Sequence, residues 1–208
     1  MVIRRKKPTF APQNGIRCRV SVKVMNFQTI IDQYYPEDDD LRRLLLKHSS
    51  QVASRCLLIC DNHPELNLNR SFLEEAAMLH DIGIRWCYAP SIYCNGTEPY
   101  VCHGLIGGKL LRQAGFEQHA RVCERHTGAG ITQMPTGGDG TPLLPEDWLR
   151  EGRFVPQTLE EQVVCYADKF YSKSHPDRVL SVGQAAQTLE RFGSDGVKRF
   201  LIWAQKFE

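Results

Sequence analysis

The chain has 208 residues, of which 42% are hydrophobic and 24% are charged, and its formal net charge is +2. This size suits one globular domain with a substantial core. No apolar run reaches the ~18–20 residues that would span a bilayer. The first residues also lack the uninterrupted apolar segment of a secretory leader. We therefore expect no membrane association and a cytoplasmic protein whose eight cysteines remain free thiols.

Basic residues are concentrated at the start of the chain. Residues 1–25 contain seven lysines and arginines and no acidic residue, whereas the rest of the chain has a small excess of acids. A basic tail can contact nucleic acid or anionic lipid, but the acidic remainder argues against dedicated nucleic-acid binding. We interpret residues 1–25 as a flexible N-terminal extension, or as sequence upstream of a true start at Met25. Residues 26–208 are the expected domain.

The first half of this domain reads as three helices. A helix pair is expected between residues 26 and 60. It is interrupted at Pro36, after which the acids of residues 37–40 favour a helix start. The second helix of the pair carries His48 on its apolar stripe. The sequence of residues 71–74 reads as a capping box. It would open a helix that ends at His80-Asp81, with Gly83 as a left-handed cap.

The second half continues the helical pattern around two loops. Residues 84–100 and the Gly- and Pro-rich residues 133–153 are expected to be loops, the second facing substrate. A second capping box, at residues 158–161, starts the helix that carries Asp168. Gly107-Gly108 would permit close approach of helices. The remaining predicted helices cover residues 101–116, 117–126, 182–192 and 194–207, and the whole predicts an all-α bundle.

Four histidines on four different predicted helices face the core, namely His48, His80, His103 and His126. A single buried histidine is ordinarily a core residue with satisfied ring nitrogens. Four of them, together with Asp81 and Asp168, would leave buried polar atoms unpaired at a cost of roughly 1–3 kcal/mol each. A metal ion would satisfy these atoms and fix the imidazole tautomers. The mixture of imidazole and carboxylate favours Fe, Mn, Zn or Ni.

The order of these residues, H…HD…H…H…D, with the motif His80-Asp81-Ile82-Gly83 and a later Ala-Asp-Lys at residues 167–169, resembles the HD-domain superfamily of metal-dependent phosphohydrolases, in its HDIG form. The resemblance covers residues 40–175. It implies an all-α HD-domain helical bundle with a central metal site. It also implies two metal ions, most often Fe and otherwise Mn, Ni or Zn. The implied ligands of the first ion are His48, His80, Asp81 and Asp168, and those of the second are His103, His126 and the bridging Asp81.

The resemblance further implies hydrolysis of a phosphate ester or phosphoanhydride, of a nucleotide in particular, by a metal-activated water. Many two-metal members place a phosphate-binding lysine directly after HDIG, but this chain has Ile84 and then Arg85. We expect Arg85 to substitute, because a guanidinium suits phosphate. Lys169, which adjoins Asp168, is the other expected catalytic cation, with Lys109 and Arg125 as further candidates. For each of these cations taken alone, a solvated surface charge is the more common case. The GYP motif of the cyclic-di-GMP-cleaving branch is absent, which sets that substrate aside.

Two local features stay open at this point. His119 shares a face with His126 and is the alternative ligand, although the Thr-Gly after His126 matches the family better. The small residues of segment 127–130 could admit a phosphate or ribose to the backbone. A plain helix cap and turn is the more common structure of such a segment.

Two other functional classes remain in view. A diiron oxygenase acting on a phosphonate or polyol would share the bundle and the same ligand set. A non-catalytic module could use the pocket to sense a nucleotide, although an intact ligand set speaks against this. No G-x-S-x-G elbow supports a serine nucleophile. The expected partner is a small phosphorylated substrate, and the substrate, the native metal and the oligomeric state are left open.

Overall fold

The computed structural model describes residues 25–208, so the expected basic extension lies, apart from Met25, outside the described residues. Its boundary with the domain stays a prediction. Within residues 25–208 no helix combines the length and the apolar character needed to cross a lipid bilayer. The seven cysteines of this part of the chain are free.

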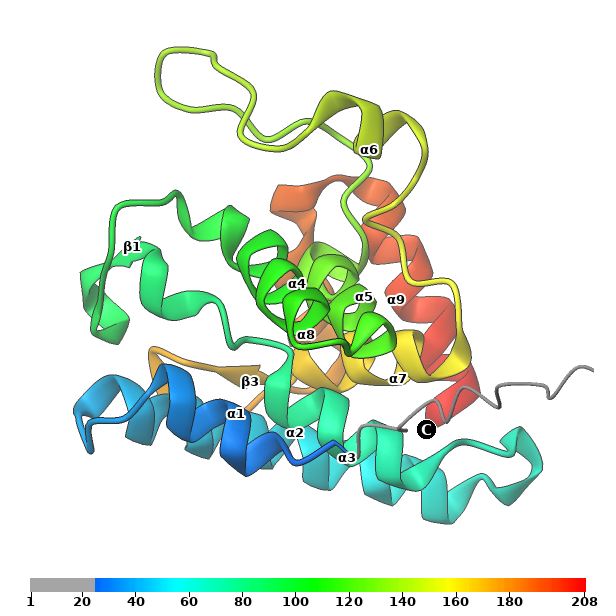
Figure 1. Ribbon diagram of the computed structural model, residues 1–208. Coiled ribbons are helices and arrows are strands. Elements are labelled where there is room, and N and C mark those ends of the chain that lie inside the picture. The colour runs from blue at the N-terminus through cyan, green and yellow to red at the C-terminus, as the bar shows by residue number, and fades with distance from the viewer. Residues whose placement is uncertain (1–24) are drawn as a thin grey trace, which may run out of the picture.

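Helices make up most of the fold, which confirms the predicted helical bundle (Figure 1). They are α1 (Phe27–Tyr34), α2 (Asp40–Asn62), α3 (Arg70–Leu79), α4 (His103–Gln113), α5 (Glu117–Arg125), α6 (Glu146–Arg150), α7 (Leu159–Asp168), α8 (Val182–Leu189) and α9 (Ser194–Phe207). Six single 3-10 turns lie between them: η1 (Pro64–Leu66), η2 (Ile84–Trp86), η3 (Pro90–Ile92), η4 (Tyr100–Cys102), η5 (Thr127–Ala129) and η6 (Glu190–Phe192).

Two small antiparallel hairpins accompany the helices. β1 (Tyr88–Ala89) pairs with β2 (Cys94–Asn95), and β3 (Tyr171–Ser172) pairs with β4 (His175–Val179). The first hairpin lies in the predicted loop 84–100, and α6 lies in the predicted loop 133–153. The sequence pattern predicted neither of the two hairpins nor α6, because such short elements show no periodicity.

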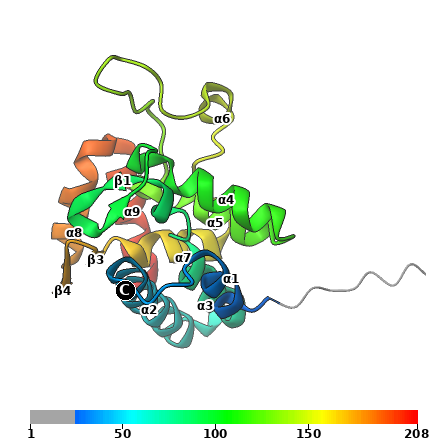
Figure 2. The same ribbon diagram turned by 60° about the vertical axis from the view of Figure 1, so that its left-hand side comes forward.

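The bundle is built around α7. α2 packs on both α3 and α7, α4 lies along α5, and α5 contacts α3 and α7. α9 covers α7 from the other side. In Figures 1 and 2 the segment that contains α6 extends away from this body. α2, α3, α5 and α7 therefore share the interior of the bundle.

Local sequence explains why α2 presents a histidine to the core. Asp39 caps the helix, its side chain accepting a hydrogen bond from the backbone N–H of Arg42 at 2.7 Å, and Asp40 adds an acid to the first turn, where the helix dipole favours it. Leu44, His48 and Val52 share the buried stripe. The predicted start of this helix after Pro36 is thus confirmed.

The two predicted capping boxes have different outcomes. The box at residues 158–161 is confirmed, because Glu161 N–H donates to Thr158 Oγ1 and Thr158 N–H donates to the Glu161 carboxylate. The box at residues 71–74 is wrong. α3 begins at Arg70, and Asn69 caps it by accepting from the Phe72 N–H at 3.1 Å. An asparagine is an equally good cap, and it lies two residues before Ser71.

Gly83 has a different role from the predicted one. Its φ of −86° is right-handed, so the left-handed cap is wrong. A Cβ at this position would lie 2.1 Å from the His103 carbonyl oxygen and 2.6 Å from the Gly107 nitrogen. Glycine is therefore required at this position because any side chain would clash with the backbone of α4, against which the HDIG turn packs. The predicted close approach at Gly107-Gly108 is confirmed, because a Cβ on Gly108 would lie 2.6 Å from the Glu124 side chain of α5.

Candidate metal centre

The six residues singled out as metal ligands come together in the interior of the bundle. His48 projects from α2, and His80 and Asp81 follow the end of α3. All six side chains are buried. The other three are His103 at the start of α4, His126 directly after α5 and Asp168 at the end of α7.

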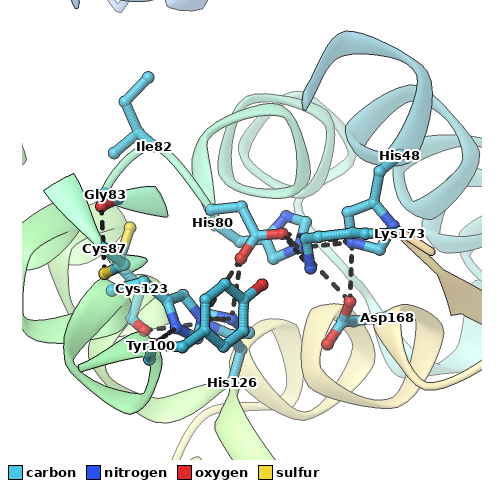
Figure 3. Close-up of polar contacts among 12 residues, drawn as sticks. His48, His80, Ile82, Gly83, Cys87, Tyr100, Cys123, His126, Asp168 and Lys173 are labelled. Carbon is cyan, nitrogen blue, oxygen red and sulfur yellow. Dashed lines mark hydrogen bonds and ion pairs between the residues drawn. The ribbon is translucent and has the colours of Figure 1, made fainter. Parts of the chain in front are cut away.

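The first cluster comprises His48, His80, Asp81 and Asp168, whose potential ligand atoms all lie within 4.8 Å of one another. His48 Nε2 lies 3.0 Å from Asp168 Oδ1 and 3.3 Å from Asp81 Oδ2. His80 Nε2 lies 3.1 Å from the same Asp81 oxygen. Figure 3 shows the His48, His80 and Asp168 side chains converging from three different segments.

The second cluster comprises Asp81, His103 and His126. The Nε2 atoms of His103 and His126 lie 3.3 and 3.4 Å from Asp81 Oδ1. Asp81 therefore presents one oxygen to each cluster. This is the geometry of a carboxylate that bridges two cations.

Backbone carbonyls fix the tautomers of three of the histidines. Nδ1 of His80 lies 2.7 Å from the Ala77 oxygen, and Nδ1 of His126 lies 2.8 Å from the Cys123 oxygen. His103 Nδ1 makes the same contact with Tyr100 at 2.6 Å. Because a carbonyl oxygen only accepts, each Nδ1 carries a proton and donates it. In its neutral form each ring therefore turns an unprotonated Nε2 toward the centre, which is the arrangement of a metal-ligating histidine.

The histidines of the two clusters differ in their pKa values. Burial alone would lower the pKa of His80, but the Asp81 and Asp168 carboxylates outweigh it and raise this pKa to about 9. Burial dominates at His103, whose pKa falls to about 3, and it also lowers the pKa of His126. The second cluster is therefore neutral on its imidazoles at physiological pH.

The carboxylates remain ionised despite their burial. Burial would raise the pKa of Asp81, but the charges of His80 and Lys173 hold it well below its usual range. At Asp168 burial is likewise outweighed, chiefly by the neighbouring Lys169 ammonium. The interior thus contains two carboxylate charges, balanced in part by His80 and Lys173, next to the neutral imidazoles of His103 and His126.

These residues fit two divalent cations. Nε2 of His103 and Nε2 of His126 face each other at 3.0 Å, although both are acceptors in the tautomers fixed by their Nδ1 contacts. Asp81 Oδ1, which faces both of these atoms, is buried without a hydrogen bond among the described groups. Unpaired buried acceptors are costly, and a cation between the three atoms would satisfy them. The nitrogen and oxygen donor set suits Fe, Mn, Ni or Zn.

A cavity of about 690 Å³ opens onto this centre. His103, His126 and Asp168 border it, as do Lys169 and Lys173. Lys169 Nζ lies 2.5 Å from Asp168 Oδ2. A predicted catalytic cation therefore stands at the cavity, beside a metal-ligand candidate.

The other predicted cations lie elsewhere. Arg85 is not among the described residues that border the cavity; its guanidinium lies over the Tyr35 ring and 3.8 Å from Asp39. Arg125 forms a buried ion pair with Glu161, and Lys109 is exposed on α4. The structure therefore brings Lys169 to the centre and separates Arg85 from it.

The open features of the sequence are also resolved in space. His119 pairs with Glu75 at 3.1 Å and is not part of either cluster, which leaves His126 as the ligand candidate on that helix. Segment 127–130 forms η5, and Thr127 and Gly128 border the cavity. Gly128 has a φ of 63°, and a Cβ on it would lie 2.7 Å from the Phe192 ring. The glycine thus permits both the turn and the close packing of Phe192.

Sequence reasoning missed two residues that the structure places at the centre. Lys173 Nζ lies 2.5 Å from Asp81 Oδ2, and Tyr100 stacks on the His103 ring with centroids 4.8 Å apart. Both border the cavity. Lys173 follows Asp168 by five residues in a segment without periodicity, and no sequence signal marks it. Tyr100 precedes His103 by three residues, a spacing that could have indicated stacking on one helical turn.

The helical bundle contains two buried His/Asp clusters that share one aspartate, an arrangement consistent with a binuclear metal site. The sequence pattern described as "HD domain" matches residues 45–172. The chain therefore belongs to the HD domain family.

Three curated relatives are similar to the chain. It is 25% identical over 182 residues to a tRNA (cytidine(56)-2'-O)-methyltransferase of Picrophilus torridus, covering 83% of this chain and 46% of that protein. It is 24% identical over 164 residues to the enzyme of the same name from Thermoplasma volcanium, covering 78% and 41%. An uncharacterized protein of Methanocaldococcus jannaschii is 34% identical over 130 residues, covering 58% of this chain and 66% of that protein.

The chain thus spans less than half the length of the two methyltransferases, so their named activity belongs to proteins about twice as long as the shared region. No solved structure matches the chain significantly.

Proposed function

We propose that this chain is a binuclear metal-dependent phosphohydrolase that cleaves a phosphate ester or phosphoanhydride of a nucleotide. One observation carries the proposal. Asp81 presents one carboxylate oxygen to each of two buried clusters, and the cavity beside them is lined by lysines. Membership of the HD domain family supports the same reaction class.

Each residue of the centre has a role in this proposal. The first cluster would hold one ion, and His103 with His126 would hold the second, with Asp81 shared. Bound divalent ions supply an acidified water and polarise a phosphoryl oxygen. Lys169, whose ammonium is fixed beside Asp168, offsets negative charge on the phosphoryl oxygens as the bond breaks. Fe is the proposed native metal, with Mn, Ni and Zn as alternatives. Arg85 has no part in the proposal, because it stands away from the cavity.

The cavity favours a nucleotide over a larger substrate. Its volume of about 690 Å³ is in the range of small-molecule sites. Tyr100, Tyr171 and Phe192 border it together with Leu180 and Leu189, and so do Lys169 and Lys173. The aromatic and apolar groups suit a base, and the two ammonium groups suit a phosphate. The names of two relatives concern tRNA, which also favours a nucleotide or a nucleotide-derived ester.

The test is a substrate screen on metal-defined protein. The chain is purified from a metal-replete host, its metal content is measured by elemental analysis, and nucleotides and other phosphoesters are offered with Mn²⁺ or Fe²⁺. We expect about two ions per chain and release of phosphate under anaerobic conditions. Oxygen uptake by the iron-loaded protein, with a product that retains its phosphate, would replace the hydrolase with an oxygenase. Failure of both reactions, with a nucleotide still bound, would indicate a sensing module.

Two aspartates provide a matched pair of variants. Asp81→Ala is expected to lose metal and phosphate release together, since both clusters depend on this carboxylate. Asp195→Ala, on α9 beside the exposed Lys198, is expected to keep both. Full metal content after Asp81→Ala would contradict the bridging role.

A further inference from the structure

A lysine that lies far from the HDIG motif reaches the centre of the candidate metal site. Lys173 stands between β3 and β4, and its Nζ lies 2.5 Å from Asp81 Oδ2. Only 14% of its side chain is exposed. Figure 3 shows Lys173 among the side chains of the candidate metal centre. The lysine is thus placed where a ligand of the metal centre would be bound.

The β3–β4 hairpin is fastened to the same helix that supplies His48. Gln51 Nε2 donates to the Pro176 carbonyl at 2.9 Å, and Lys47 Nζ lies 2.5 Å from Asp177 Oδ1. At the base of the hairpin, Leu180 N–H donates to the Phe170 carbonyl at 2.9 Å. α2 therefore fixes the lysine and one metal-ligand candidate in a common frame.

Lys173 has donors to spare for a bound anion. An ammonium group carries three N–H donors and no acceptor, and Asp81 is the one described carboxylate within ion-pair distance of it. The side chain also borders the cavity beside Lys169. Its remaining donors can therefore meet the oxygens of a molecule bound there.

The charge balance also points to an anion. Lys169 and Lys173 together neutralise Asp81 and Asp168 when these four groups are considered alone. Each divalent cation held by the clusters adds positive charge to the floor of the cavity. The resulting surplus, in a buried site with weak screening, matches the negative charge of a phosphate group.

The position after HDIG does not supply this cation. Ile84 is fully buried in the apolar core, and the Arg85 guanidinium lies against Tyr35 and Asp39. We propose that Lys173, carried by the β3–β4 hairpin, is the phosphate-binding residue of this site and contacts a non-bridging phosphoryl oxygen of the substrate. This inference rests on the proposed function and adds a catalytic residue to it.

The experiment measures binding of inorganic phosphate to the full chain loaded with Mn²⁺, by titration calorimetry, alongside metal content. Lys173→Met removes the charge and keeps the length of the side chain, and Lys173→Arg retains the charge. Lys198→Met, at an exposed position of α9, is the matched control. We expect Lys173→Met to weaken phosphate binding at least about tenfold, as loss of a charge-assisted hydrogen bond does, with metal content unchanged. Lys173→Arg should restore part of the affinity, and Lys198→Met should match the parent protein.

Two results would overturn the inference. One is a folded Lys173→Met protein that binds phosphate as the parent does, and the other is loss of metal with no separate effect on phosphate, which would make Lys173 a counter-ion only. If Lys173→Met does not fold, a crystal structure of the parent protein with Mn²⁺ and phosphate decides. A phosphate whose oxygens all lie beyond hydrogen-bond reach of Lys173 Nζ refutes the assignment.

Different results would contradict the role of Lys173 and the proposed hydrolase function. Lys173-dependent phosphate binding without hydrolysis of any phosphoester would keep the anion site and remove the hydrolase. Hydrolysis with KM and phosphate affinity both unchanged in Lys173→Met would keep the hydrolase and remove this role of Lys173.

Discussion

His103 and His126 face each other through their Nε2 atoms at 3.0 Å, while each donates its Nδ1–H to a backbone carbonyl three residues earlier. The two rings come from different helices, so the contact is imposed by the packing of α4 on α5. Two lone pairs directed at each other are stable only around a shared positive charge.

His48→Ala and His103→Ala should each remove one ion and leave the other, since His48 belongs to the first cluster and His103 to the second. Elemental analysis after dialysis should therefore give about one ion per chain for each variant, against about two for the parent. His119→Ala is the control, because this histidine is also buried but pairs with Glu75. It should retain full metal content. Equal loss of both ions in the two ligand variants would contradict separable positions.

Gly83→Ala should destabilise the fold and reduce metal content. The new Cβ would meet the backbone of His103 and Gly107 at 2.1 and 2.6 Å, and backbone atoms cannot move aside without separating the HDIG turn from α4. Overpacking of this kind costs typically about 1–3 kcal/mol. Urea unfolding measures the loss.

Gly183→Ala is the matched control for that change. This glycine is in α8, and a Cβ on it would meet nothing within 4 Å. The free energy of unfolding should stay the same or rise by up to about 1 kcal/mol. A parallel loss of stability in both variants would show that crowding is not the reason for glycine at position 83.

Arg125→Ala should lower stability rather than substrate affinity. Arg125 Nη1 lies 2.8 Å from both oxygens of Glu161, and that carboxylate also accepts from the backbone of Gln157 and Thr158. Removing one partner of a buried pair costs about 3–5 kcal/mol. Thermal and urea unfolding should show this loss, and the folded fraction should keep its KM. An increase in KM without loss of stability would instead favour a phosphate-binding role for Arg125.

The stability of the metal-free protein should pass through a maximum near neutral pH. Between about 3, the folded pKa of His103, and its ordinary value of 6.5, the unfolded chain binds more protons, so stability falls as the pH drops through this window. His80 acts in the opposite sense. Its folded pKa of about 9 lies above 6.5, so its contribution is complete below 6.5 and is lost as the pH rises to about 9.

Urea unfolding of EDTA-treated protein from pH 5 to pH 9 measures both limbs. His103→Gln should flatten the acid limb, and His80→Gln should flatten the alkaline limb. A stability that rises steadily up to pH 9 would contradict the raised pKa of His80.

The convergence of the ligand residues could be predicted because each lies on, or at the end of, a helix with strong apolar periodicity. His48, for example, is on the same stripe as Leu44 and Val52, and a buried imidazole there needs a partner. The HD order then indicated which residues would share that partner. The cap of α3 was misplaced by two residues because Asn69 and Ser71 are chemically similar caps.

The cations around the centre could not be predicted in the same way. Arg85 follows the HDIG motif in sequence, yet the η2 turn directs it toward Tyr35. Lys173 reaches Asp81 from a hairpin whose first strand has only two residues. Side-chain direction in such short segments depends on tertiary packing rather than on local pattern.

The segment that contains α6 has its own small apolar cluster, formed by Ile131, Leu144 and Phe154 and separate from the main core. Leu143 and Pro135 of this segment border the cavity. Because few buried contacts stabilise it, this part can unfold locally at a free energy below that of the whole bundle. Amide hydrogen exchange should therefore be faster here than in α7. The access route for substrate can then vary in width while the histidines and aspartates at the bottom of the cavity stay in place.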